Sequence, residues 1–87
     1  MDEKLKEVLR FIKEEMEKSV KPINIYRYHY LEQKAEKDID SLPSVENKKE
    51  FRYLLDECTR KGYLKQIELG TTASYALTEY GLSFIAN

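Results

Sequence analysis

The apolar residues between positions 3 and 18 recur at the spacing of one helical stripe. Glu and Lys fill most of the positions between them. A repeat of three and four residues places apolar side chains on one face of an α-helix and charged ones on the other. We therefore predict a first helix over 3–18, ending before Pro22, which lacks a backbone donor. The stripe consists of Leu5, Val8, Leu9, Ile12 and Met16.

The segment after Pro22 fits two patterns. Ile23-Asn24-Ile25 is short enough to be a single bridge strand, and the tyrosines at positions 26, 28 and 30 alternate as in a strand. Helical spacing is also present, and residues 31–37 are good helix formers without a breaker. We predict a helix from about Ile25 to Lys37, with the strand as the alternative. The helical stripe is Tyr28, Leu31, Ala35 and Ile39.

A third helix is predicted over about 45–61. Ser44 is a suitable N-cap, acidic residues come early, basic residues lie in the last turn, and Gly62 supplies a left-handed residue at the end. Helical periodicity places apolar residues on one face and polar, mostly charged residues on the other. The apolar face comprises Phe51, Leu54, Leu55 and Cys58, and the polar face Lys49, Arg52, Tyr53, Asp56 and Arg60.

Two short runs after Gly62 alternate with a period of two. They predict antiparallel strands over 63–69 and 75–77, joined by a tight loop at Gly70-Thr71-Thr72. Thr78 can cap a short final helix, Glu79 to Ala86, whose aromatic residues would fold back on the sheet or on a partner. The pattern is therefore that of an α+β, mainly α domain with three helices, a two- or three-stranded antiparallel sheet and a short C-terminal helix.

Composition limits the function classes. A chain of 87 residues is long enough for one domain, 1–87, and contains neither a secretory signal nor an apolar run that could span a membrane, which predicts a cytoplasmic protein. A lone cysteine, Cys58, predicts a buried structural thiol and no disulfide or zinc site. His29, the only histidine, has no nucleophile near it in sequence. We expect no catalytic residues, no metal and no cofactor.

Charge is distributed unevenly along the chain. The net charge is −1, but residues 45–66 carry six basic and four acidic groups, whereas residues 67–87 carry two acidic groups and no basic one. One helix face can concentrate such a local excess of positive charge. The third predicted helix is thus the best candidate for contact with nucleic acid.

Residues 44–82 resemble the recognition helix, wing and closing helix of winged helix-turn-helix transcriptional regulators of the MarR and PadR type. The resemblance rests on Leu54-Leu55, on Arg60-Lys61-Gly62-Tyr63-Leu64, and on Tyr75-Ala76-Leu77-Thr78-Glu79-Tyr80-Gly81. It implies a winged helix whose third helix enters the major groove and whose hairpin lies along the DNA backbone. The chain lacks the long extra helices through which those regulators dimerise, so we expect a monomer or a weak homodimer.

These observations predict a small winged-helix protein that binds double-stranded DNA, a transcriptional regulator that reads DNA with the helix over 45–61. The alternative is a winged-helix module that binds another protein without DNA, through its tyrosine-rich second segment and its uncharged wing. A third interpretation of the helix is a solvated charged face. The predicted DNA-binding residues are Lys48, Lys49, Arg52, Tyr53 and Arg60.

Overall fold

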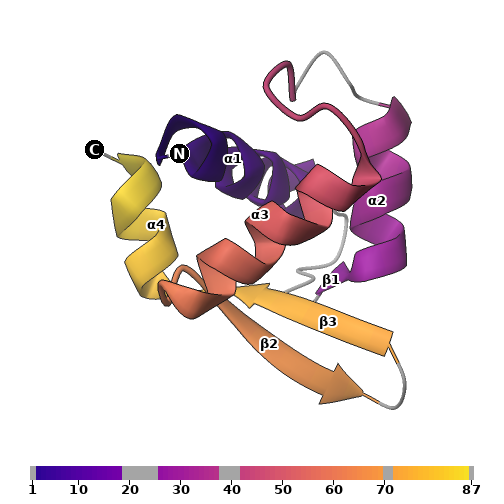
Figure 1. The fold of residues 1–87 in the computed structure, drawn as a ribbon. Coiled ribbons are helices and arrows are strands. Elements are labelled where there is room, and N and C mark those ends of the chain that lie inside the picture. The colour runs from indigo at the N-terminus through magenta and orange to yellow at the C-terminus, as the bar shows by residue number, and fades with distance from the viewer. Residues whose placement is uncertain (1, 19–25, 38–41, 70–71, 87) are drawn as a thin grey trace.

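The computed structural model describes residues 2–18, 26–37, 42–69 and 72–86. Within these ranges helices predominate over strands, and both termini lie on the helical side of the molecule (Figure 1). The predicted α+β, mainly α class is confirmed at this level. In chain order the elements are α1 (Asp2–Lys18), β1 (Tyr26–Arg27), α2 (Tyr28–Lys37), α3 (Lys48–Arg60), β2 (Leu64–Leu69), β3 (Thr72–Leu77) and α4 (Glu79–Ala86).

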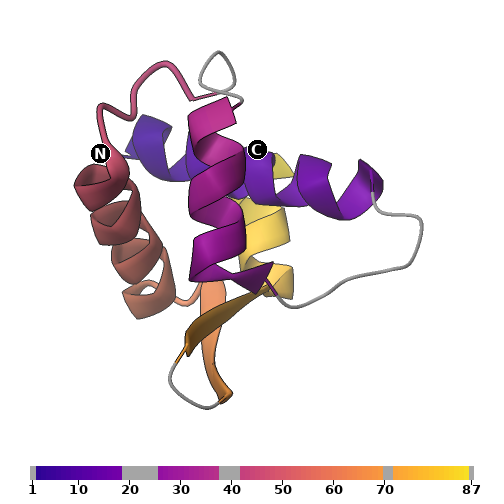
Figure 2. The ribbon, with the colours of Figure 1, turned by 90° about the vertical axis from the view of Figure 1, so that its right-hand side faces the viewer.

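The sheet has the strand order β1-β3-β2, and both pairings are antiparallel. The β2–β3 hairpin runs from the pair Leu64 and Leu77 to the pair Leu69 and Thr72, and it extends away from the helices (Figures 1 and 2). Strand β1 adds only two residues to the other edge of β3. The predicted hairpin is confirmed, with a second strand three residues longer than expected.

The helix predicted for the second segment is confirmed over 28–37, against the strand alternative. The prediction is wrong for Tyr26 and Arg27, which form β1 because their backbone pairs with Tyr75 and Ser74 of β3. The alternating tyrosines allowed a strand here, but which residues form it depends on a pairing with a segment distant in sequence. The bridge strand predicted at Ile23-Asn24-Ile25 lies outside the described residues.

The start of α3 was also placed wrongly by the N-cap prediction at Ser44. The N-cap is Asn47, whose Oδ1 accepts a hydrogen bond from the backbone N–H of Glu50 at 2.9 Å. Glu50 Oε1 in turn accepts from the N–H of Glu46 at 3.2 Å. Upstream, the N–H of Val45 donates to the carbonyl of Leu42, so the chain turns there instead of entering the helix. In a capping box, a Glu or Gln follows the N-cap residue by three positions. Asn47 has Glu50 at that position, whereas Ser44 does not have an acidic residue there.

The apolar faces of the helices meet in one cluster above the sheet. The predicted stripe of α1 is buried apart from Met16, which packs against the cluster. Phe11 of α1 also belongs to the cluster, and its ring meets the ring of Phe51 edge-on, with the centroids 6.3 Å apart. The buried apolar residues of α3 are those predicted, with Cys58 fully buried. The remaining members come from elsewhere in the chain: Leu31, Leu42, Tyr63, Leu64, Tyr75 and Ile85.

The junction between α3 and the hairpin is fixed by hydrogen bonds from Thr78. Gly62 ends α3 with a φ of 87°, as predicted. The Thr78 hydroxyl donates toward the carbonyls of Gly62 and Tyr63, at 2.7 and 3.0 Å, and accepts from the N–H of Gly81 at 3.0 Å. Thr78 therefore caps α4, as expected, and ties that helix to the end of α3.

A helix that crosses a bilayer needs about 20 mostly apolar residues. None of the helices in the described ranges is long and apolar enough to cross a membrane.

Candidate nucleic-acid interface

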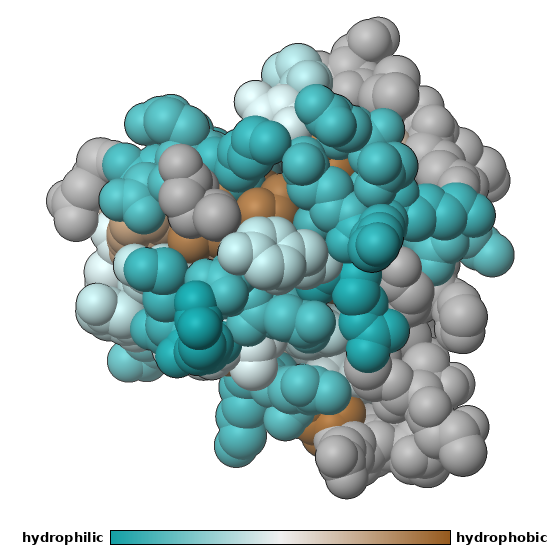
Figure 3. Space-filling view, in the orientation of Figure 1, coloured by the Kyte–Doolittle hydropathy of each residue, from teal (hydrophilic) through white to brown (hydrophobic). Residues whose placement is uncertain are grey.

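The exposed face of α3 carries all five predicted DNA-binding residues. Each is solvent-exposed, because the apolar residues between them anchor the opposite face of the helix in the core. In Figure 1 α3 crosses the front of the molecule, and the same view in Figure 3 shows a mainly hydrophilic surface there. The structure therefore brings together, on one helix face, Lys48, Lys49, Arg52, Tyr53 and Arg60.

Both ends of this helix are held in place. At the start, the Asn47 cap is supported by Glu50, whose carboxylate also accepts a hydrogen bond from Lys4 Nζ on α1 at 3.2 Å. At the end, Gly62 and Thr78 attach α3 to the hairpin and α4. The face is thus presented by a helix fixed to the rest of the fold, which favours a rigid recognition surface.

Three of the four basic residues on this face have acidic partners. Lys48 Nζ lies 3.0 Å from Glu32 Oε1 on α2, Arg52 Nε lies 4.0 Å from Asp56 Oδ2, and Arg60 pairs with Glu57. The basic side chains in these pairs are 48 to 73% exposed. Asp56 is 55% exposed, so the Arg52–Asp56 pair contributes only about 0–1 kcal/mol and a phosphate group can replace its carboxylate at little cost. Glu32 and Glu57 are only 16 and 12% exposed, so moving Lys48 or Arg60 to a phosphate would leave a largely buried carboxylate without its cation.

Lys49 and Tyr53 differ from the other three residues. Lys49 is exposed, and within the described part of the chain no ion pair joins it to a carboxylate. Tyr53 is 50% exposed. Tyr53 can donate its hydroxyl to a phosphate or stack on a base, and Lys49 can pair directly with a phosphate.

Acidic side chains lie beside the basic ones and reduce the positive charge of this surface. Glu32 was not expected there, because its pairing with Lys48 depends on how α2 packs against α3 and leaves no signal in the sequence. Asp56 lies on the polar face that helical periodicity predicted, whereas Glu57 is buried. The face is therefore of mixed charge, with its cations in excess.

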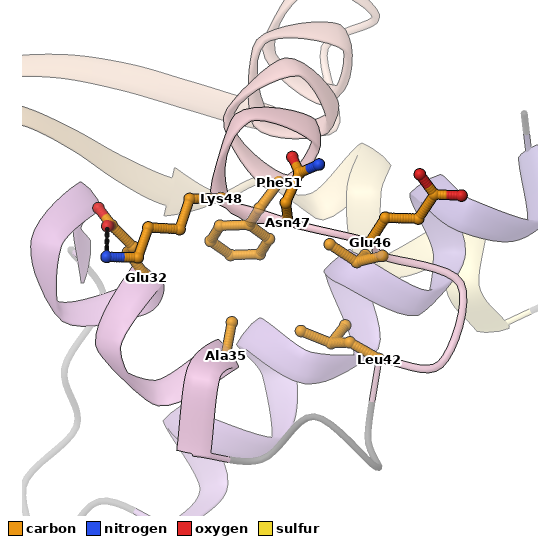
Figure 4. A pocket seen from close by; sticks show the side chains of 8 residues that line it. Glu32, Ala35, Leu42, Glu46, Asn47, Lys48 and Phe51 are labelled. Atoms are coloured by element: carbon orange, nitrogen blue, oxygen red, sulfur yellow. Dashed lines mark ion pairs between the residues drawn. The ribbon is translucent and has the colours of Figure 1, made fainter.

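A hollow of about 290 Å³ lies beside the start of α3 (Figure 4). Its walls are mainly apolar, and the Lys48–Glu32 ion pair stands at its edge, while the carboxylate of Glu46 points away from it. Lys48 consequently leans toward α2 rather than outward from α3. The lining residues are Glu32, Ala35, Leu42, Val45, Glu46, Asn47, Lys48 and Phe51.

The buried side chains Cys58, on the inner face of α3, and Tyr63, just after it, have structural roles. The pKa of the Cys58 thiol is raised to about 12, mainly by burial and also by the nearby Glu57, while Lys61 acts in the opposite direction. Cys58 is thus neutral at physiological pH and unsuited to act as a nucleophile. At the end of the helix the Tyr63 ring stacks between Tyr80, at 5.2 Å, and Phe84, at 4.1 Å. The fold-back predicted for the aromatic residues of α4 is confirmed by these contacts.

Tyr63 also carries a shifted pKa. Its pKa is raised, first by desolvation and then by the neighbouring Tyr80. The hydroxyl therefore remains protonated at neutral pH, and the stack adds no charge to the surface.

Other candidate groups give little further chemistry. The side chains of His29 and of the tyrosines at 26, 28 and 30 lie outside the described residues. Within the described ranges no three His, Cys, Asp or Glu side chains gather in a way that could hold a metal ion. The exposed face of α3 is thus the surface with the most recognition chemistry.

Comparisons with protein-family models, with curated proteins and with solved structures gave no match to this chain.

Proposed function

We propose that this protein is a small winged-helix DNA-binding protein, a transcriptional regulator that reads duplex DNA with the exposed face of α3. The observation that carries the proposal is the placement of the predicted residues. Five side chains able to contact phosphates or bases share one exposed face of a helix that is fixed at both ends.

The order of the elements supports the proposal. Helix α2 and helix α3 are packed together, and the antiparallel hairpin β2–β3 follows α3 directly, with β1 on the outer edge of β3 (Figure 2). In a winged helix, the helix before the hairpin is the one presented to the major groove. A single α-helix fits this groove, and Lys and Arg on it can pair with phosphates or with guanine.

The charge pattern sets how strong the binding should be. Because Lys48, Arg52 and Arg60 already have acidic neighbours, only part of their charge is available to DNA. The hairpin adds little, since its only basic residue is Lys65, near the start of β2. We therefore expect about two to four phosphate contacts per chain, fewer than the 6–10 of a strongly binding protein.

The alternative is a winged-helix module that binds another protein. The exposed Tyr53 and Tyr80 and the carboxylates on α3 favour it, because aromatic groups and mixed charge suit a protein surface. Such binding would depend little on salt. A cytoplasmic location and a monomeric or weakly dimeric state remain predictions under either function.

The test is fluorescence-anisotropy titration of a mixed duplex pool at low salt with the wild type and with a Lys49→Glu, Arg52→Glu double variant. We expect the double variant to lose about 10- to 100-fold in affinity, because two contacts become repulsive. The matched control is the double variant Lys13→Glu, Lys18→Glu, which makes the same charge change on α1. Both lysines are solvent-accessible, and each pairs with a Glu of its own helix.

The control is expected to bind much as the wild type does. Equal losses in both double variants would show that net charge, and not α3, governs binding. An unchanged affinity in the α3 variant, with its fold verified by circular dichroism, would rule out α3 as the DNA-reading element.

A further inference from the structure

A carboxylate stands in the middle of the exposed face of α3. Asp56 lies four residues after Arg52 and four before Arg60, and its side chain is 55% exposed. Its Oδ2 lies 4.0 Å from Arg52 Nε. When a helix occupies the major groove, side chains on its exposed face reach the base edges. Asp56 would then face the bases or the adjacent phosphates.

The chemistry of a carboxylate limits what Asp56 can face. An ionised carboxylate only accepts hydrogen bonds, and a phosphate repels it. In the major groove the only donors are the amino groups of cytosine and adenine. Adenine presents the N7 acceptor beside its amino group, whereas cytosine itself presents no acceptor in the major groove beside its N4 amino group. Cytosine is therefore the base that suits Asp56 best.

The neighbouring Arg52 suits the complementary base. A guanidinium can donate two hydrogen bonds to O6 and N7 of guanine. Residues four apart on a helix are separated by about 6 Å along its axis, which is less than two base-pair steps of about 3.4 Å each. Arg52 and Asp56 can thus reach one G·C pair or two adjacent pairs.

We propose that Asp56 is a specificity-determining residue, which selects cytosine in the DNA site while Arg52 contacts guanine of the same or the next base pair. The inference rests on the proposed function and deepens it by naming the bases read. It also gives a role to an acidic residue that would otherwise weaken binding to DNA.

The experiment is selection of binding sites from a randomised duplex pool at low salt, followed by affinity measurements on single-base variants of the selected site. It uses the wild type, Asp56→Asn and Asp56→Ala. The matched control is Glu17→Gln, which removes one negative charge from another exposed pair at i, i+4 spacing, Lys13 with Glu17 on α1. All four proteins are checked by circular dichroism and thermal unfolding.

We expect the wild type to prefer cytosine at one position by about 5- to 100-fold. Asp56→Ala should reduce that preference to less than about twofold, and Asp56→Asn should shift it toward adenine, because Asn pairs with adenine N6 and N7. Glu17→Gln should retain the cytosine preference. This result would establish Asp56 as the selecting residue.

Two different failures can be told apart. If the wild type binds DNA but both Asp56 variants select the same site with the same ratios, the role of Asp56 is overturned and DNA binding stands. If the wild type binds no duplex even at low salt, the proposed function fails and the inference falls with it.

Discussion

The carbonyl oxygen of Tyr63 is the point at which α3, β2 and α4 come together. It accepts from both the hydroxyl and the N–H of Thr78, and a Cβ added to Gly81 would lie only 2.3 Å from it. The motif Leu77-Thr78-Glu79-Tyr80-Gly81 is therefore explained by local geometry. Thr78 supplies the hydrogen bonds, and Gly81 lets α4 approach the backbone.

Replacement of Gly81 by Ala should destabilise the protein. Ala is normally more stable than Gly inside a helix by about 1 kcal/mol. Here, however, the added Cβ would collide with the backbone of Tyr63, which cannot move aside as a flexible side chain could. We expect the free energy of unfolding to fall by about 1–3 kcal/mol, measured by urea denaturation. The matched control is Ala86→Ser, at the exposed last position of the same helix, which should change stability by less than about 0.5 kcal/mol. A stabilising effect of Gly81→Ala would contradict the close packing of α4.

Cys58 should be almost unreactive in the folded protein. Its pKa of about 12 keeps the thiol protonated, and the side chain is fully buried. At pH 8 we expect a thiol reagent to label it only as fast as the protein unfolds, and rapidly in denaturant. Because the pKa of Cys58 in the folded protein lies above the ordinary thiol value of 9.0, the associated stability is present below pH 9 and is lost as the pH rises toward 12. Rapid labelling without denaturant would show that the thiol is accessible.

At the scale of the element, helix α3 shows which features the sequence can predict. Its exposed residues and its buried apolar residues were predicted correctly, because a period of 3.6 residues assigns both faces at once. The burial of Glu57 was not predicted. Nor was its first residue, since Ser44 and Asn47 are both good caps and the choice depends on Glu50 and on the turn at Leu42–Val45.

Features that depend on contacts between distant segments could not be predicted from the sequence either. Strand β1 exists only because β3 offers it an edge, and Lys48 pairs with Glu32 only because α2 packs beside α3. The positions of the candidate DNA-binding residues could thus be predicted, but their acidic partners on another helix could not.

The N-cap assignment leads to a direct comparison of two variants. Asn47→Ala removes the acceptor for the Glu50 N–H and should lower the free energy of unfolding by about 1 kcal/mol. Ser44→Ala, at the position that the sequence favoured, should change it by less than about 0.5 kcal/mol. Urea denaturation of both proteins measures the difference. A larger loss in the Ser44 variant would mean that α3 begins earlier than Lys48.

For the whole molecule, one arrangement accounts for the proposed activity. The core joins α1, α2 and α3 on one side of a small sheet, and this fixes the polar face of α3 outward, next to the hairpin. The face has an excess of cations but is not strongly basic, in keeping with the net charge of −1. Recognition is therefore expected to depend on a few contacts from a rigid helix more than on overall charge.

The most direct test is the binding of duplex DNA by the intact chain, measured by fluorescence anisotropy over a series of salt concentrations. With about two to four phosphate contacts, binding should be detectable at low salt, and log K should fall with log salt with a slope of about −2 to −4. No binding at the lowest salt, or binding that is independent of salt, would contradict DNA recognition through α3 and favour a protein partner.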